Sequence, residues 1–302
     1  MGDYIHTPGG PVHVVDFGGT GQVFLLVHGL GGSTANWNAI GPRLTQFGHV
    51  VAMDLPGFGL SPPRANWRLE THAQAISEIV DTHGGRAALV GNSLGGLLSQ
   101  MVAASRSEDV DSLILISPAT PPRLPDPRIN WSMARQLALS ATPGVGSLMS
   151  RRLMAKLTAE QLIDESLERI AHKKGRVPMD LVEAFVDLAR TRQSYPWAVD
   201  AVPKTSASIR NLFMRRSRFV EMIREITAPT LVIQGVADPI VSPTSVDWLC
   251  SLRPDWTLIH MEDTGHVPQI DAPVRLFAHL EEWLETRSSL ADRVPLRGKQ
   301  SA

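Results

Sequence analysis

Ser93 stands in the run Gly91-Asn92-Ser93-Leu94-Gly95, which directly follows the apolar segment 87–90. A serine with a glycine two positions away on each side suits a sharp turn between a strand and a helix, because only small neighbours let the chain pass so closely. Such a turn exposes the hydroxyl at a helix N-terminus, where free N–H groups and the helix dipole favour negative charge. The spacing therefore predicts that Ser93 is a nucleophile rather than an ordinary serine in a glycine-rich turn.

Two side chains further along the chain are suited to activate this serine. Asp238 follows the apolar segment 230–234 and His266 follows the segment 256–261, so each lies just past a predicted strand. A serine hydroxyl is too weakly acidic to attack unaided; His266 would accept its proton, and Asp238 would fix the imidazole tautomer. The chain order serine, aspartate, histidine is that of hydrolases built on a nucleophile elbow. Singly, Asp238 could start a turn before Pro239 and His266 could be a loop histidine, but their joint placement favours the chemistry.

A second glycine-rich run, His28-Gly29-Leu30-Gly31-Gly32, follows the apolar segment 23–27. Glycines after a strand leave backbone N–H groups unpaired and able to face a ligand. The N–H groups of Leu30 and Leu94 could together stabilise the oxyanion of an acyl-transfer intermediate. Three neighbours are expected to support these loops: His28, Gly29 and Asn92. Neither run has the spacing of a phosphate-binding loop or of a dinucleotide fingerprint.

Predicted strands and helices, which must position these groups, alternate along the chain. Apolar segments predict buried strands at 12–17, 23–27, 50–53, 87–90, 113–116, 230–234 and 256–261. The segment 12–17 is predicted to be the first strand. Helical periodicity outside the middle of the chain predicts helices at 37–47, 69–83, 94–104 and 272–285. This alternation favours an α/β fold with a mostly parallel central sheet flanked by helices.

The alternation stops after Ser117. A proline-rich connector follows, and the patterns from Trp131 onwards are helical, at 131–139, 148–156, 159–172, 180–192 and 206–214. An insertion after a strand's C-terminal end lies over the site edge of such a sheet, where it can act as a lid. We therefore divide the chain into a first core segment 1–117, a helical cap 118–226, a second core segment 227–286 and a flexible tail 287–302.

Composition narrows the class of protein. With 43% hydrophobic and 20% charged residues among 302, the chain has ample material for a globular core. The net charge of −1 indicates no global attraction to nucleic acid or to an anionic membrane. The single cysteine excludes an intrachain disulfide framework. Because we find no signal-peptide pattern and no apolar run of about 18 residues, we expect a cytoplasmic protein with no nucleic-acid partner and no stable membrane insertion. The sequence leaves open whether the protein forms a homodimer.

The chain resembles α/β-hydrolase-fold proteins that carry a helical cap. The resemblance rests on the two glycine-rich runs, on the segment 54–61 (Asp-Leu-Pro-Gly-Phe-Gly-Leu-Ser), on Asp238 and on Gly265-His266, and it covers roughly residues 10–285. It implies the following catalytic groups: a triad of Ser93, Asp238 and His266, with main-chain oxyanion donors at Leu30 and Leu94. It implies neither a cofactor nor a metal.

The identity of the nucleophile distinguishes the enzyme classes within this family. Ser93 argues against the dehalogenase and epoxide-hydrolase branches, which place aspartate at this position. The Asn92-Ser93 pair is similar to the elbow of hydrolases that cleave carbon–carbon bonds in ring-fission (meta-cleavage) products, although those enzymes usually carry tryptophan where this chain has Val267. Their cap also supplies an arginine to the substrate carboxylate. Four cap arginines are available for that role: Arg135, Arg190, Arg192 and Arg210.

These observations predict a serine hydrolase, of the carboxylesterase or small-lipase kind, whose substrate is a small-molecule ester or lipid-like compound with an apolar acyl group. Two alternatives stay open on the same fold. One is a carbon–carbon bond hydrolase of ring-fission products that uses the same triad. The other is a non-catalytic receptor for a small molecule, because receptors can retain a triad.

Overall fold

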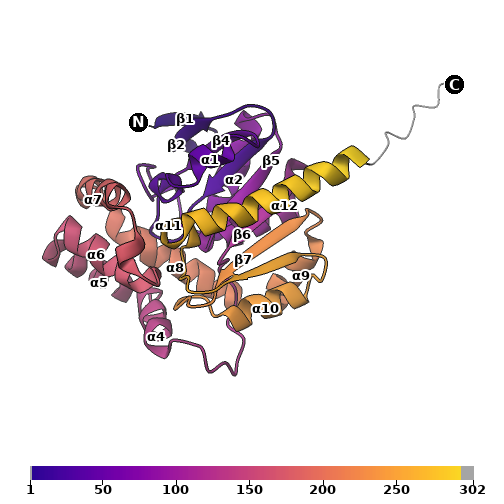
Figure 1. Cartoon of the computed structure of the whole chain (residues 1–302). Helices are drawn as coiled ribbons and strands as arrows, with labels where there is room; N and C mark the ends of the chain where they lie inside the picture. The colour runs from indigo at the N-terminus through magenta and orange to yellow at the C-terminus, as the bar shows by residue number, and fades with distance from the viewer. Residues whose placement is uncertain (1, 294–302) are drawn as a thin grey trace.

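One eight-stranded sheet forms the centre of the molecule, with the strand order β1-β2-β4-β3-β5-β6-β7-β8 (Figure 1). The strands are β1 Asp3–Thr7, β2 Gly10–Gly18, β3 Val23–Val27, β4 His49–Met53, β5 Ala87–Asn92, β6 Val110–Ile116, β7 Thr230–Gly235 and β8 Thr257–Met261. The computed structural model describes residues 2–293. β2 pairs antiparallel with β1 and β4, and the neighbours from β4 to β8 pair in parallel. The predicted mostly parallel α/β architecture is confirmed.

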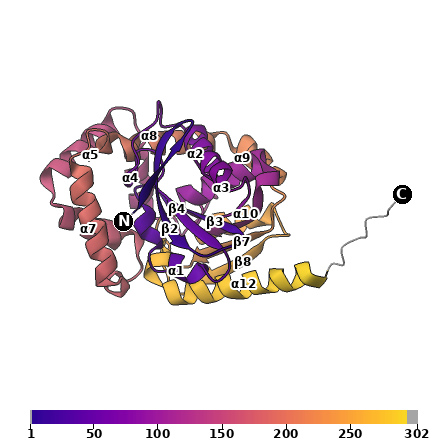
Figure 2. The same ribbon diagram turned by 90° about the horizontal axis from the view of Figure 1, so that it is seen from above.

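Helices cover both faces of this sheet (Figure 2). Outside the segment between β6 and β7 they are η1 Thr34–Trp37, α1 Gly41–Leu44, α2 Leu69–Thr82, α3 Leu94–Ser105, η2 Ser107–Asp109, α10 Pro243–Ser251, α11 Pro268–Asp271 and α12 Pro273–Arg293. One apolar core joins the strands to α2, α3 and α10, and a second core on the opposite face joins them to η1, α1 and α12. β5 is buried along its whole length, as expected for a strand that lies between two helical layers.

A run of helices separates β6 from β7. These helices are α4 Trp131–Ser140, α5 Val145–Lys156, α6 Ala159–Ile170, η3 Lys174–Arg176, α7 Met179–Gln193, α8 Ala198–Met214 and α9 Arg216–Glu225. Figure 1 shows α4 to α7 to one side of the sheet. α9, which was not predicted, packs into the core beside α3 through Phe219 and Ile223. The division of the chain at 117, 226 and 286 stays a prediction.

Two predictions near the N-terminus are wrong. The first strand is β1, which pairs with β2 along the sheet edge, so the segment 12–17 belongs to the second strand. The helix predicted at 37–47 is two short pieces, η1 and α1. Pro42 starts a new helix there, and Gly41 packs so closely on Phe17 that a Cβ would lie 2.6 Å from its ring.

Two helices are longer than predicted. α8 begins at Ala198 and continues through Pro203 in its second turn, although proline donates no N–H to the helix and usually marks a helix boundary. α12 continues to Arg293, so residues 287–293 of the predicted flexible tail are helical. The rest of that tail, 294–302, lies outside the described residues.

A histidine on α2 is buried where the core meets α8. The ring centroid of His72 lies 6.0 Å from that of Phe58, which lies 5.9 Å from that of His28. Nε2 of His72 lies 3.4 Å from Oγ1 of Thr205. Removal from water penalises the charged ring and lowers the pKa of His72 to about 4.

We predict that His72 destabilises the fold in mild acid. The unfolded ring takes up a proton below about pH 6.5, whereas the folded ring stays neutral down to about 4. Because the unfolded state binds the extra proton in that window, the free energy of unfolding falls as the pH drops, by up to about 3 kcal/mol. Urea titrations should show a smaller fall for His72→Gln than for the parent, with the exposed His6→Gln as control. An equal fall in His72→Gln and the parent would contradict this.

Candidate active site

Ser93 lies in a strained turn between β5 and α3. Its φ of 52° and ψ of −113° are rare for residues other than glycine. A Cβ on Gly91 would lie 2.5 Å from the backbone of Gly95, and a Cβ on Gly95 would lie 2.0 Å from the carbonyl oxygen of Val27. The N–H of Ser93 donates to the carbonyl of Ile116 at 3.0 Å. These contacts place Ser93 at the C-terminal edge of the sheet and at the start of α3.

His266 and Asp238 are hydrogen-bonded to each other. Nδ1 of His266 lies 2.8 Å from Oδ2 of Asp238, and both side chains are buried. The other oxygen, Oδ1, accepts from the N–H groups of Ile240 at 2.8 Å and Val241 at 2.9 Å. The aspartate thus shapes a turn with one oxygen and faces the imidazole with the other. A carboxylate at Nδ1 favours the tautomer in which Nε2 is free to act as a base.

Asn92 connects the turn of Ser93 to the loop of His266. Its Nδ2 donates to the carbonyl of Ile116 at 3.0 Å and to the carbonyl of His266 at 3.2 Å. The side chain is almost fully buried, so these two bonds satisfy both amide protons. The backbone of His266 is thereby held next to the residue that precedes Ser93.

The glycine-rich loop after β3 lies against Ser93. A Cβ on Gly29 would lie 3.2 Å from the Cβ of Ser93. Beneath the loop, Nε2 of His28 accepts from the N–H of Leu55 at 3.0 Å, and Nδ1 donates to the carbonyl of Gly29 at 2.7 Å. Because the ring accepts at one nitrogen and donates at the other, His28 is neutral, and its burial lowers its pKa below the ordinary value.

The two predicted oxyanion donors, Leu30 and Leu94, are chain neighbours of Gly29 and of Ser93. Leu94 is the first residue of α3, so its N–H belongs to the helix N-terminus and has no intrahelical acceptor. Leu30 follows Gly29 in the loop that touches Ser93, and its side chain packs against the core. N–H groups in these positions can face an oxygen atom bound above Ser93.

Asp271, on α11, is a residue that the motifs do not indicate. Its Oδ2 accepts from the N–H groups of Gly265 at 2.7 Å and His172 at 3.0 Å. The N–H of His266 in turn donates to the carbonyl of Ile170, at the end of α6, at 2.8 Å. The histidine loop is therefore bonded to the main chain of the helical segment. The only sequence signal is one acidic residue in the otherwise uncharged stretch 267–274.

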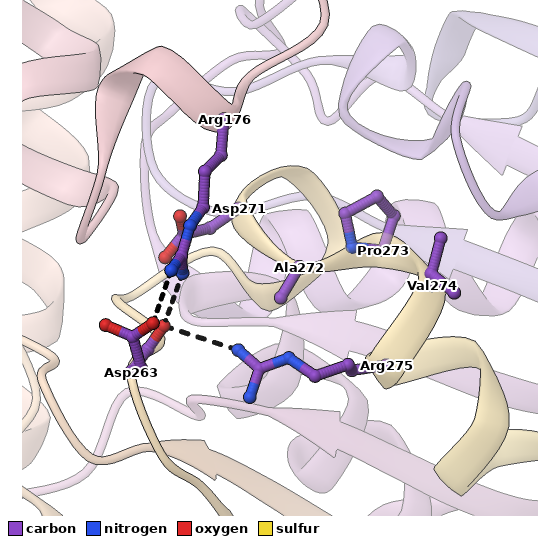
Figure 3. Close-up of a pocket in the computed structure, with 7 residues that line it drawn as sticks. All are labelled: Arg176, Asp263, Asp271, Ala272, Pro273, Val274 and Arg275. Atoms are coloured by element: carbon purple, nitrogen blue, oxygen red, sulfur yellow. Dashed lines mark hydrogen bonds and ion pairs between the residues drawn. The ribbon is translucent and has the colours of Figure 1, made fainter.

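An ion-pair cluster lies beside Asp271 (Figure 3). The carboxylate of Asp263 lies 2.8 Å from Nζ of Lys173 and also pairs with Arg176, while its carbonyl accepts from Arg275 at 3.3 Å. The cations Lys173 and Arg176 hold the pKa of Asp263 well below its usual range. Asp271, Asp263, Arg176 and Arg275 line a shallow cleft of about 320 Å³. The carboxylate of Asp263 thus pairs with side chains of the helical segment between β6 and β7, whereas Asp238 contacts the imidazole of His266.

Of the four arginines considered above, Arg192 is hydrogen-bonded to the loop between β4 and α2. It donates to the carbonyl of Gly59 at 2.7 Å and to that of Gly57 at 3.1 Å. Its partial burial lowers the pKa of the guanidinium below its ordinary value. Arg190 instead forms exposed ion pairs with acidic side chains of α6 and α7. The inward arginine is therefore already engaged by backbone oxygens.

Within residues 2–293, no three histidine, cysteine or acidic side chains are grouped so as to hold a metal ion. The helices of this described range are each too short or too polar to cross a bilayer.

Comparison with known proteins places these features in context. Residues 22–273 match the family model described as alpha/beta hydrolase fold. Lipase 1 of Psychrobacter immobilis is 27% identical over 256 residues, which are 83% of this chain and 73% of that protein. Haloalkane dehalogenase 2 of Mycobacterium tuberculosis is 30% identical over 277 residues, 90% of this chain and 91% of that protein. A crystal structure of a meta-cleavage product hydrolase from Pseudomonas fluorescens superposes with a TM-score of 0.68 at 24% identity, covering 95% of this chain and 98% of that one.

We predict that Asp271→Ala loosens the histidine loop, whereas Asp271→Asn, which keeps an acceptor oxygen, does so less. The alanine leaves one buried and one part-buried N–H group without their acceptor, which should lower the free energy of unfolding by about 2–4 kcal/mol. Hydrogen exchange should accelerate at the amides of Gly265 and His172. Asp3→Asn, at an exposed residue of β1, serves as control. Parent-like exchange at both amides in Asp271→Ala would show that the carboxylate does not hold the loop.

Proposed function

The chain belongs to the α/β-hydrolase family, and on that premise we propose that it is a serine hydrolase that cleaves carboxylic esters of apolar acyl groups. Fold alone does not select a reaction, so the proposal depends on the site. The observation that carries it is the 2.8 Å contact between Asp238 and His266, together with the backbone bond from Asn92 that holds His266 beside the strained turn of Ser93.

In the proposed reaction Ser93 attacks the acyl carbonyl carbon. Nε2 of His266 takes the hydroxyl proton and returns it to the departing alkoxide, while Asp238 stabilises the imidazolium. The N–H groups of Leu30 and Leu94 stabilise the oxyanion of the tetrahedral intermediate. A water molecule, deprotonated by the same imidazole, then attacks the acyl-enzyme, releases the acid and restores the serine.

The nucleophile argues against cleavage of carbon–halogen bonds, although one relative is named a haloalkane dehalogenase. Displacement of a halide by the oxygen of Ser93 would leave an alkyl ether on the enzyme. An ether has no carbonyl carbon for water to attack, so the enzyme would not turn over. A carboxylate nucleophile avoids this, because it forms an ester that water can hydrolyse. Serine at this position therefore favours acyl transfer.

Cleavage of carbon–carbon bonds in ring-fission products is the second candidate. The Asn92-Ser93 pair and the similarity in fold to a meta-cleavage product hydrolase favour it. Such substrates carry a carboxylate that needs a cationic partner from the cap. Arg192 already donates to the carbonyls of Gly57 and Gly59, and this engagement supports the uncharged ester as substrate. A non-catalytic receptor, the third possibility, would bind a small molecule without turning it over.

A turnover panel tests the proposal. The parent and Ser93→Ala are assayed with p-nitrophenyl esters from acetate to long chains and with a ring-fission dienoate. We expect ester hydrolysis with an optimum at one chain length and its loss in Ser93→Ala, together with loss of labelling by a fluorophosphonate. Turnover of the dienoate alone would select the second candidate. Binding without turnover of either substrate would select the receptor.

We further predict that Asp238→Asn lowers kcat by about 10³- to 10⁴-fold, because an amide at Nδ1 favours the wrong imidazole tautomer. The turn should persist, since the amide oxygen can still accept from Ile240 and Val241. Circular dichroism and thermal unfolding check that the fold is retained. Asp3→Asn, at an exposed residue of β1, is the control and should keep a kcat within about twofold of the parent, the range of small surface effects. A near-normal rate in Asp238→Asn would remove this aspartate from the mechanism.

A further inference from the structure

Large apolar side chains are unusually exposed on α4 and α5. Trp131 is 65% exposed, and Leu148 is 48% exposed. The other exposed apolar side chains on these two helices are Leu137, Leu139, Val145, Met149 and Leu153. Single exposed apolar residues are common on protein surfaces, but a concentration of them on adjacent helices marks an interaction surface.

The way these helices pack explains the exposure. Every side chain of α4, all of them described, is at least partly exposed, and α5 buries only Gly146 among its described residues. α5 rests on α8, where a Cβ on Gly146 would lie 2.8 Å from the Cβ of Pro203 and where Ser147 donates to Asp200 at 2.6 Å. These contacts join one side of α5 to α8, and the residues of α5 other than Gly146 are at least partly exposed. We call the sides of α4 and α5 that carry the exposed side chains their outer faces.

Basic residues share the exposed faces with the apolar ones. Arg135 lies between Trp131 and Leu139 at intervals of four residues, so the three form one stripe of α4. On α5 the same interval joins the exposed residues Leu148, Arg152 and Lys156. An exposed helix face that mixes large apolar and basic side chains is typical of helices that lie in the headgroup region of a membrane.

The charged side chains of α4, α5 and the loop between them are all basic. Residues 131–156 contain four basic side chains, Arg135, Arg151, Arg152 and Lys156, and no aspartate or glutamate, in a chain whose net charge is −1. The next helix, α6, is mainly acidic. It carries Glu160, Asp164, Glu165 and Glu168 and one arginine. The two helices that expose the apolar residues therefore carry only basic charges of their own.

We infer that the outer faces of α4 and α5 form a docking surface for an anionic phospholipid membrane. Lipid phosphates attract the basic side chains, and the apolar ones enter the boundary between headgroups and acyl chains. Trp131 suits this boundary because its ring is amphipathic. A symmetric dimer through this face would oppose two cationic surfaces, and a nucleic acid would leave the apolar side chains in water. Docking is independent of the proposed catalysis, since it needs neither Ser93 nor His266.

The test measures binding of the full chain carrying Ser93→Ala to sedimenting vesicles. The protein should bind vesicles that contain phosphatidylglycerol at least about tenfold more tightly than vesicles of phosphatidylcholine alone, and salt should weaken that binding. Arg135→Gln/Arg152→Gln should reduce it about tenfold. Trp131→Ser/Leu148→Ser should also reduce it.

Matched controls carry the same kinds of change elsewhere. Val274, which is 67% exposed on α12, is replaced by serine, and Arg86, whose side chain is 63% exposed, by glutamine. Both should bind as the parent does, and unchanged thermal unfolding should show that all variants are folded. Equal binding to the two kinds of vesicle, or equal loss in the controls, would overturn the inference. The inference would also be overturned if the protein did not bind vesicles but formed a dimer that Trp131→Ser/Leu148→Ser dissociates. Tighter binding to duplex DNA than to vesicles would overturn it as well.

Discussion

Close packing where α3 leaves the end of β5 is the constraint on which the site depends. Gly91 and Gly95 bring the helix directly against the sheet, and the turn between them forces Ser93 to a positive φ, which costs on the order of 1–3 kcal/mol. Backbone bonds on both sides of the turn offset that cost: Ser93 donates to Ile116, and its carbonyl accepts from Ala119, each at 3.0 Å. The side chain of Ser93 is thereby held beside the loop of Gly29.

Buried carboxylates hold the loops around this turn. Asp54 accepts from the N–H groups of Thr34 at 2.6 Å and Leu60 at 2.8 Å, and Asp238 and Asp271 each accept two N–H bonds in the same manner. A loop has no neighbouring strand to satisfy its N–H groups, so a carboxylate that accepts several of them fixes its shape. Asp238 does this with one oxygen while the other faces the imidazole.

The helical segment is joined to the core unevenly. Ile170 and His172 bond to the loop of His266 and to Asp271, and Arg192 bonds to the carbonyls of Gly57 and Gly59. α4 and α5 instead rest on α8 and expose their outer sides. If the segment opens as a lid, α4 and α5 can therefore move without breaking the backbone bonds that position the imidazole, whereas α6 cannot.

The sequence by itself determined the sheet, the serine turn and the order of the reactive residues, because buried parallel strands need continuous apolar runs and a strained turn needs glycines at fixed spacing. It did not reveal β1, the break after Trp37 or the role of Asp271. Each depends on a partner distant in the chain: β2 for the edge strand, Phe17 for Gly41, and His172 for the carboxylate. Only the tertiary structure decided that one oxygen of Asp238 meets His266, since local spacing specifies a turn but not what faces it across the fold.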